Sequence, residues 1–442
     1  MRLTILGGGG FRVPLIHRAL LAAGDVELTL HDVAGDRLAA IGRVLAAQAR
    51  GAGHAPAVTA TTDLTEALDG ADFVFSAIRV GGLDGRITDE RVAMAEGVLG
   101  QETAGAGGVS YALRTVPVAV AIARRVAAVA PHAWVINFTN PAGLVTEAMA
   151  AHLGDRVIGI CDSPVGLGRR VAAALGVDPA RLRLDYAGLN HLGWLLGADL
   201  DGRDLLPGLL ADPAALATVE EGRLFGAEWL QTLGAVPNEY LHYYYNNRET
   251  VAAVRAAGAT RGEVLLEQQR RCYELLRAGP ADALAVWDGA RLERERTYQA
   301  ENRAAAGAGE RDETDLVSGG YEHVALALMR AIGRDERTRL ILNVRNRGAV
   351  PALDDDAVVE VPCTVDAAGA RPDRVAALPD HAAGLVATVK ASERAVLQAV
   401  RDRSATAALR AFATHPLVDS VTVAGRLLAA YRRAFPELAY LR

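Results

Sequence analysis

The chain has few cysteines, few aromatic residues and no strong excess of either charge. Its 442 residues include three cysteines, Cys161, Cys272 and Cys363, whose odd number and wide spacing exclude a disulfide framework. We therefore expect a reducing, cytoplasmic location. The net charge of −6 argues against nucleic acid as a partner. No apolar run reaches the roughly 18 residues that a transmembrane helix needs, so no membrane partner is expected.

The chain does contain a regular alternation of short apolar strands and helical segments. Nearly continuous apolar strands separated by helices are typical of a parallel sheet that is covered on both faces. The sequence therefore predicts an α/β fold: a Rossmann-like, doubly wound, mostly parallel sheet over residues 1–165. A second, α+β domain is expected over residues 166–442, with antiparallel strands near 339–366 and a helical end from about residue 377.

The first strand runs directly into four glycines. A helix and a second strand ending near Asp32 follow, which is the order of a dinucleotide-binding βαβ unit. The glycines allow the backbone to approach a pyrophosphate, and the acid binds a ribose hydroxyl. A purely structural turn is the alternative, and Arg12 occupies the position of the usual third glycine. The candidate cofactor-binding residues are Gly7, Gly8, Gly9, Gly10, Phe11, Arg12, Asp32 and Arg37.

Polar side chains follow three further strands at the point where each strand ends. Arg79, Asn140 and the pair Cys161-Asp162 occupy these positions. Because the carboxyl ends of parallel strands meet at one edge of the sheet, we expect these residues beside the glycine turn. Alone, each has a structural explanation: a surface charge, a helix cap, or a buried cysteine beside a solvated acid. Together they predict a ligand site.

The segment after Cys161-Asp162 is expected to open a helix. Ser163 is a good N-cap and Pro164 fits the first helical position, as Pro141 does after Asn140. At such a place the field of the helix N-terminus favours a thiolate. On these residues alone, Cys161 is either a metal ligand or reactive group, or a small buried cysteine beside a solvated Asp162.

Two features of the second half bear on this site. His191 lies in an apolar, strand-like run; it is either a hydrogen-bonded core histidine or a partner of Cys161 in a metal site with open positions. By ligand softness, such a pair favours zinc or iron over manganese. Four tyrosines, Tyr240 and 243–245, suit an aromatic packing face, or one of them serves as a base if a cation lowers its pKa.

Taken together, these stretches resemble glycoside hydrolase family 4, whose members need both NAD and a divalent metal. The similar stretches are GGGGFRVP, IRVGGLDGR, GQETAGAGGVSYALRT, NFTNPAGLVTEA, GICDSPVGLGRR, GLNHLGW, PNEYLHYYY and DDDAVVEVPC. They occur in the family's order over nearly the whole chain, and NFTNPAG and PNEYLHYYY are most similar to the 6-phospho-β-glucosidase branch. NVRNRGAVPAL departs from the family's usual asparagine- and proline-rich form.

The resemblance implies a role for each candidate residue. It implies that Cys161 and His191 bind the metal, usually Mn(II), and that Tyr240 removes the C2 proton. Asp162 matches the acid that protonates the leaving oxygen. The implied substrate-binding residues are Arg79, Asn140 and Arg261, and the glycine turn with Asp32 would hold NAD.

The reaction implied by the resemblance oxidises the sugar at C3, eliminates across C1 and C2, adds water and reduces C3 again. It implies a small phosphorylated glucoside as substrate and a homodimer or homotetramer. Two other classes stay open: an ordinary NAD-dependent dehydrogenase of the malate or lactate type, and a nucleotide-sensing protein without turnover. Within the family, activity on α-glucosides or on non-phosphorylated sugars is a further alternative.

Overall fold

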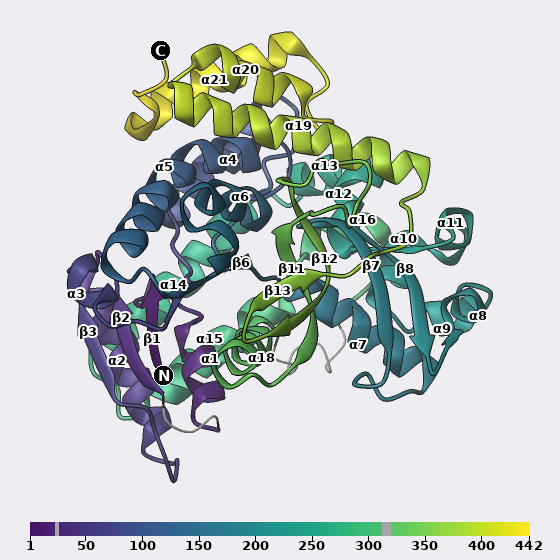
Figure 1. The fold of residues 1–442 in the computed structure, drawn as a ribbon. Coiled ribbons are helices and arrows are strands. Elements are labelled where there is room, and N and C mark those ends of the chain that lie inside the picture. The colour runs from purple at the N-terminus through teal and green to yellow at the C-terminus, as the bar shows by residue number, and fades with distance from the viewer. Residues whose placement is uncertain (23–25, 312–319) are drawn as a thin grey trace.

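The computed structural model describes residues 1–22, 26–311 and 320–442 (Figure 1). Its first half is a parallel sheet in the order β3-β2-β1-β4-β5-β6, the order of a dinucleotide-binding fold. The strands are β1 (Arg2–Leu6), β2 (Glu27–His31), β3 (Val58–Thr61), β4 (Phe73–Ser76), β5 (Trp134–Asn137) and β6 (Val157–Gly159). β4 is buried along its whole length, as expected for a strand covered on both faces. The predicted fold class is confirmed.

Helices alternate with these strands. They are α1 (Val13–Leu20), α2 (Gly35–Ala49), α3 (Leu64–Leu68), α4 (Gly82–Ala95), α5 (Gly105–Val129), α6 (Ala142–Leu153) and α7 (Ser163–Leu175). Among the described helices, α5 alone is long and apolar enough to cross a membrane, but 78% of its most apolar stretch is buried inside the protein. Burial of that kind is typical of a core helix.

The second half continues the same sheet with antiparallel strands, in the order β6-β11-β12-β7-β8-β10. These are β7 (Arg183–Leu189), β8 (Leu192–Leu200), β10 (Val236–Pro237), β11 (Thr338–Arg345) and β12 (Val358–Asp366), with β9 (Arg203–Asp204) and β13 (Gly369–Pro372) at the side. Antiparallel pairing of β11 with β12 was expected from sequence and is confirmed. Because β11 also pairs with β6, the two halves share one sheet. The proposed division at residue 165 stays a prediction.

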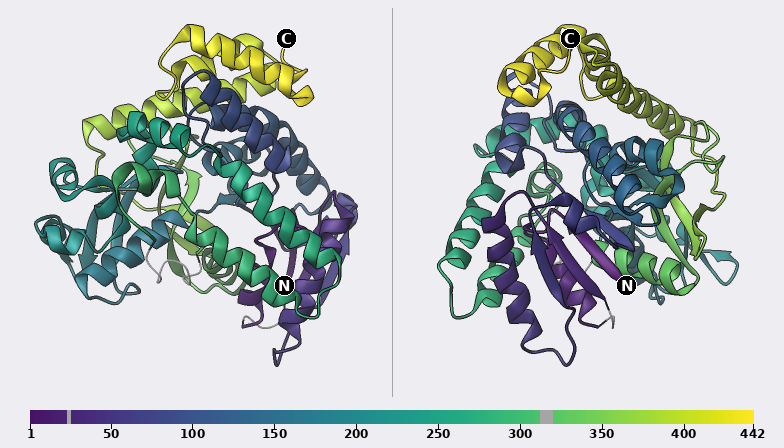
Figure 2. Two further views of the ribbon diagram at one scale, coloured as in Figure 1. Left: turned by 180° about the vertical axis from the view of Figure 1, so that it is seen from behind. Right: turned by 60° about the vertical axis from the view of Figure 1, so that its left-hand side comes forward.

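The helices of the second half surround these strands and reach back over the first half. They are α8 (Leu206–Leu210), α9 (Pro213–Leu216), α10 (Glu220–Phe225), α11 (Ala227–Leu233), α12 (His242–Tyr245), α13 (Asn247–Ala256), α14 (Arg261–Arg277), α15 (Ala283–Arg296), α16 (Ala300–Ala306), α18 (Tyr321–Arg334), α19 (Asp380–Asp402), α20 (Ala405–Thr414) and α21 (Val421–Ala434). The last three confirm the predicted helical end. α14 packs on α2 and α4, so the long teal helices in the left view of Figure 2 lie along the N-terminal half.

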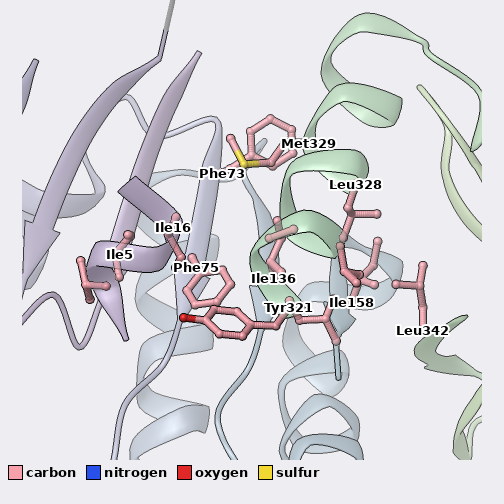
Figure 3. Packing of buried hydrophobic residues seen from close by; sticks show 14 of the residues in the cluster. Ile5, Ile16, Phe73, Phe75, Ile136, Ile158, Tyr321, Leu328, Met329 and Leu342 are labelled. Atoms are coloured by element: carbon pink, nitrogen blue, oxygen red, sulfur yellow. The ribbon is translucent and has the colours of Figure 1, made fainter. Parts of the chain in front are cut away.

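One hydrophobic core joins the two halves. Phe73 and Phe75 of β4 lie against Met329 and Tyr321 of α18, with Ile136 and Ile158 from the next two strands beside them (Figure 3). These side chains are at most 2% exposed. Large apolar side chains buried this completely contribute about 1.5–3 kcal/mol each. The core therefore fixes α18 firmly along the parallel strands.

Candidate active site

The glycine turn has the close packing that its sequence suggested. Gly7 has a φ of +84°, and a β-carbon there would lie 2.6 Å from the Ala77 carbonyl oxygen. The backbone N–H of Gly9 donates to Asp32 Oδ2 at 3.0 Å, and Gly10 N–H donates to the Gly7 carbonyl at 2.8 Å. The turn therefore has no room for side chains, and Asp32 lies directly beside it, which suits a bound pyrophosphate and ribose.

Three aromatic side chains of the second half donate hydrogen bonds to carbonyls of this turn. The Tyr273 hydroxyl donates to the Gly9 oxygen at 2.6 Å. Trp287 Nε1 donates to the Phe11 oxygen and the Tyr321 hydroxyl to the Arg12 oxygen, both at 2.8 Å. The sequence gave no signal for these contacts, because each joins residues more than 250 positions apart. They position the turn against α14, α15 and α18.

The side chains of Phe11, Arg37 and Arg12, which were predicted to bind the cofactor, have different surroundings. The Phe11 ring is buried against Trp287, so only its backbone is available to a ligand. Arg37 lies over the Tyr273 ring and donates to the Gly9 carbonyl at 3.4 Å. Arg12 instead pairs with Asp162 at 3.4 Å, which connects the turn to the Cys161-Asp162 pair.

We expect the Gly9→Ala variant to weaken NAD binding by tenfold or more, or about 1.4 kcal/mol. Its β-carbon would lie 2.7 Å from the Arg37 β-carbon and 3.0 Å from Asp32 Oδ2. Gly42→Ala in α2 is the matched control, since nothing lies within 4 Å of that position. Titration of each variant with NAD by calorimetry checks this; equal affinities in the two variants would contradict a cofactor role for the turn.

The Cys161-Asp162 pair lies between β6 and α7, as predicted, but the cap differs. The helix begins at Ser163, so Asp162 is the N-cap and makes no side-chain cap hydrogen bond. The Asp162 carboxylate is therefore available to Arg12. The cap of α6 also differs, but in the opposite direction: Pro141 is the N-cap instead of the first helical residue, and half-buried Asn140 precedes it through a cis peptide bond.

The surroundings of Cys161 oppose the expected thiolate. Burial raises the pKa of Cys161 well above its usual value, and the carboxylates of Glu360 and Asp162 raise it further. Hydrogen bonds with Ser163 lower the pKa, but by less than burial and the carboxylates raise it. A thiolate at this position therefore needs a cation close to the sulfur.

His191 lies in the two-residue turn between β7 and β8, not within a strand, and has a φ of +61°. A non-glycine residue in this conformation is strained, which is common at functional sites. Its ring stacks on Tyr240 with centroids 3.6 Å apart, and its Nδ1 lies 2.8 Å from the Thr103 hydroxyl. Burial lowers its pKa to about 4, so the ring is neutral at neutral pH and its Nε2 is not engaged by Thr103.

These donors fit a divalent metal. A neutral imidazole and a thiol suit a transition metal, and a hydroxyl on the second ring nitrogen is a common way to orient a metal-binding histidine. Asp162 lies close enough to act electrostatically on both Cys161 and His191. Within the described residues, no group of three or more His, Cys, Asp and Glu side chains forms a metal cage. A two-ligand site would leave positions for substrate oxygens.

Tyr240 is buried and belongs to a network that the sequence did not indicate. Its hydroxyl lies 3.0 Å from the Tyr298 hydroxyl, and Tyr298 lies 3.0 Å from Glu239 Oε1. Burial raises the Tyr240 pKa well above 10. Tyr240 therefore needs a nearby cation or a route for its proton before it can act as a base.

The predicted substrate residues lie around a group of arginines. Arg79 pairs with Glu102 at 2.7 Å, and Arg86 pairs with the same carboxylate at 3.0 Å. Arg261 donates to Thr297 Oγ1 at 2.7 Å and to the Arg294 carbonyl at 3.2 Å. Sequence reasoning missed Arg86, Glu102 and Arg294. Glu102 and Arg86 lie within the quoted motifs, but Arg294 lies in a Glu- and Arg-rich stretch that no motif marks.

A cavity of about 580 Å³ opens beside the Arg12–Asp162 pair, and the arginine group around Glu102 is not part of its lining. It lies between α1, α7, α15 and α18, and Arg12, Asp162, Glu239 and Tyr298 are among its lining residues. Asp162 and the Tyr298 hydroxyl therefore face one open space. A volume of this size suits a small organic ligand.

The order of the parallel strands and the glycine turn with Asp32 place the chain in the class of dinucleotide-binding folds, with a buried tyrosine, a thiol and an imidazole beside it. Comparison with known proteins identifies the family within that class: residues 3–177 match "Family 4 glycosyl hydrolase" and residues 186–418 match its C-terminal domain. The chain belongs to this family, and the resemblance seen in the sequence is confirmed. The chain is therefore a glycosidase by family, and the dehydrogenase alternative is not supported.

Relatives of both anomeric types match almost the whole chain. A probable 6-phospho-beta-glucosidase of Bacillus subtilis is 33% identical, over 97% of this chain and 95% of its own length. A 6-phospho-alpha-glucosidase of Lacticaseibacillus paracasei is 28% identical over 98% of each chain. The solved 6-phospho-beta glucosidase of Thermotoga maritima, with manganese, NAD+ and glucose-6-phosphate, is 26% identical with a TM-score of 0.82 over 99% of both chains.

Proposed function

We propose that this protein hydrolyses 6-phospho-β-glucosides with NAD and Mn(II), or another divalent metal, as cofactors. The observation that carries the proposal is the stacking of Tyr240 on His191, close enough to Asp162 for the carboxylate to act on the His191 ring. This arrangement offers a base, two metal donors, an acid and a dinucleotide site. An elimination route needs these groups and does not need two carboxylates flanking the glycosidic bond.

Each residue then has one task in the reaction. Bound NAD supplies a hydride acceptor for the C3 carbon, and the bound metal supplies a Lewis acid for the sugar oxygens. Cys161 and His191 would hold the metal. Tyr240 takes the proton from C2, Asp162 gives a proton to the leaving oxygen, and the glycine turn with Asp32 orients the dinucleotide. A base and an acid on separate elements permit elimination across C1 and C2.

The unbalanced charge at Arg294 favours a phosphorylated substrate. Burial and the positive charges of Arg12 and Arg261 together lower the Arg294 pKa to about 9, against the attraction of Glu295. Its Nε is buried without a hydrogen-bond partner among the described residues. Among the described residues, Glu295 and Glu102 attract this guanidinium without forming an ion pair with it, and a phosphate dianion would supply both the charge and the acceptor oxygens.

We expect Arg294→Gln to reduce kcat/KM for an aryl 6-phospho-β-glucoside by about 100-fold, as for a charge-assisted hydrogen bond worth about 1.5–3 kcal/mol. Activity on the non-phosphorylated aryl glucoside, measured in parallel, should change little. Arg296→Gln, on the exposed side of the same helix, is the matched control. An equal loss on both substrates in the Arg294 variant would contradict phosphate recognition by this residue.

The proposed preference for β-glucosides rests on the sequence identity, which is higher to the Bacillus subtilis relative than to the Lacticaseibacillus paracasei relative. The test is aglycone release from aryl 6-phospho-α- and 6-phospho-β-glucosides, with and without NAD, Mn(II) and a thiol reductant. We expect the β substrate to react faster and every activity to require both cofactors. Release of the aglycone without NAD would overturn the proposal. Faster cleavage of the α substrate would show that the enzyme prefers α-glucosides instead of β-glucosides. The homo-oligomeric state and the cytoplasmic location stay predictions.

A further inference from the structure

We propose that Tyr298 and Glu239 form a proton relay that carries the C2 proton between Tyr240 and the 580 Å³ cavity. The inference rests on the proposed function, because it takes Tyr240 as the base. Tyr240 is 8% exposed, and both Tyr298 and Glu239 line the cavity. These two residues therefore provide a hydrogen-bonded route from the buried base to an open space.

The three oxygen atoms form one continuous chain. Tyr240 and Tyr298 hydroxyls are 3.0 Å apart, and the Tyr298 hydroxyl is 3.0 Å from Glu239 Oε1. Tyr298 has a single proton to donate. When Glu239 is ionised, Tyr298 donates to it and accepts from Tyr240. When Glu239 is protonated, the direction reverses and Tyr298 donates to Tyr240, which stabilises a phenolate there.

Glu239 can hold the transferred proton. Burial raises its pKa to about 7, against the attraction of Arg170 at 3.0 Å. Glu221 raises the pKa too, although Arg170 also pairs with it. The charged and titratable groups that face Glu239 are Arg170 from α7, Glu220 and Glu221 from α10, Tyr298 after α15, Arg311, and its chain neighbour Tyr240. A carboxyl group with a pKa near neutral exchanges protons readily at physiological pH.

The proton balance closes without another reactant. Before C2 is attacked, the Tyr240 proton moves to Tyr298 while the Tyr298 proton moves to Glu239. The C2–H bond then breaks as a new O–H bond forms on Tyr240, and the electron pair of C2 expels the leaving oxygen. While the eliminated sugar is bound, the proton taken from C2 exchanges through Tyr298 and Glu239 with water in the cavity. After water has added at C1, Tyr240 gives the exchanged proton to C2. The Glu239 proton then passes back through Tyr298 and restores the starting state.

The test compares three variants in the full-length enzyme with NAD and Mn(II). Tyr298→Phe should lower kcat about 100-fold with little change in KM, as expected when general acid–base assistance is lost. The wild-type kcat should rise with pH through about 7 as Glu239 ionises. Glu239→Gln should remove this rise. Tyr440→Phe, which loses one hydrogen bond to the Leu113 carbonyl, is the matched control and should keep the wild-type profile.

Two outcomes separate this inference from the proposed function. If Tyr240→Phe is inactive while Tyr298→Phe keeps the wild-type kcat and pH profile, the relay is wrong and the base assignment stands. If Tyr240→Phe is active, the base assignment itself fails. Incorporation of solvent deuterium at C2 gives a second measure, which should fall in Tyr298→Phe if the relay delivers the proton to the cavity; wild-type incorporation in that variant would count against the relay.

Discussion

Tyr240→Phe should lose activity by about 10²–10⁴-fold while it retains NAD and Mn(II) binding. Removing the hydroxyl removes the only group on the stacked tyrosine that can accept the C2 proton, and a positioned acid or base contributes about this factor. The phenylalanine ring preserves the stacking on His191, so the metal ligand stays in place. Steady-state kinetics with calorimetric titration of NAD and Mn(II) separates lost chemistry from lost binding.

Tyr245→Phe is the matched control for this variant. Its hydroxyl accepts a hydrogen bond from Trp194 Nε1 at 3.0 Å, away from the Tyr240–Tyr298 network. We expect a loss of about 0.5–1.5 kcal/mol in unfolding free energy and near-normal kcat. A Tyr240→Phe enzyme as active as this control would refute the role of Tyr240 as base.

Cys161→Ser should lose metal binding and activity together and keep NAD binding. A serine hydroxyl is a harder and weaker ligand than a thiolate. Loss of a residue that only orients a ligand costs about 10–100-fold in metal affinity, so we expect loss of the ligand itself to lower the Mn(II) affinity by more than about 100-fold. The glycine turn is held by Asp32 and Tyr273, which the substitution does not touch. Metal content by atomic emission and NAD titration on the same sample check both parts.

Cys363→Ser provides the control for the cysteine change. Cys363 is buried in β12 and donates to the Val361 carbonyl at 3.4 Å, a contact that serine can also make. This variant should keep its metal and its activity. Normal metal content in Cys161→Ser would show that the metal ligand has been assigned incorrectly.

The architecture was predictable because it depends on local patterns. Apolar strands that alternate with helices indicated the parallel half, and the glycine turn with Asp32 indicated the dinucleotide motif. The sharing of one sheet by both halves was not predictable, since Asn343 of β11 meets Gly159 of β6 across 184 positions that no local pattern connects. The polar residues expected after strands do follow strand ends, whereas the N-cap residues expected for α6 and α7 were wrong by one position.

The candidate site residues that stand at strand ends or in motifs could be predicted from the sequence. Those that lie on or just after a helix of the second half were missed. Cys161, Asp162, His191 and Tyr240 stood in recognisable stretches. Tyr298 and Arg294 lie at the end of a charged helix, and only the packing of α15 against the first half turns them towards the site. His191 was expected in a strand because its neighbours are apolar; the two-residue turn between β7 and β8 shows why that pattern misled.

Elimination through C2 is the central claim, and solvent deuterium tests it most directly. The enzyme is run to completion on an aryl 6-phospho-β-glucoside in D2O with NAD and Mn(II), and the released 6-phosphosugar is examined by NMR. We predict deuterium at C2, because Tyr240 removes the C2 proton and the site returns one that has exchanged with solvent. Complete aglycone release with C2 still carrying only its original hydrogen would contradict the account.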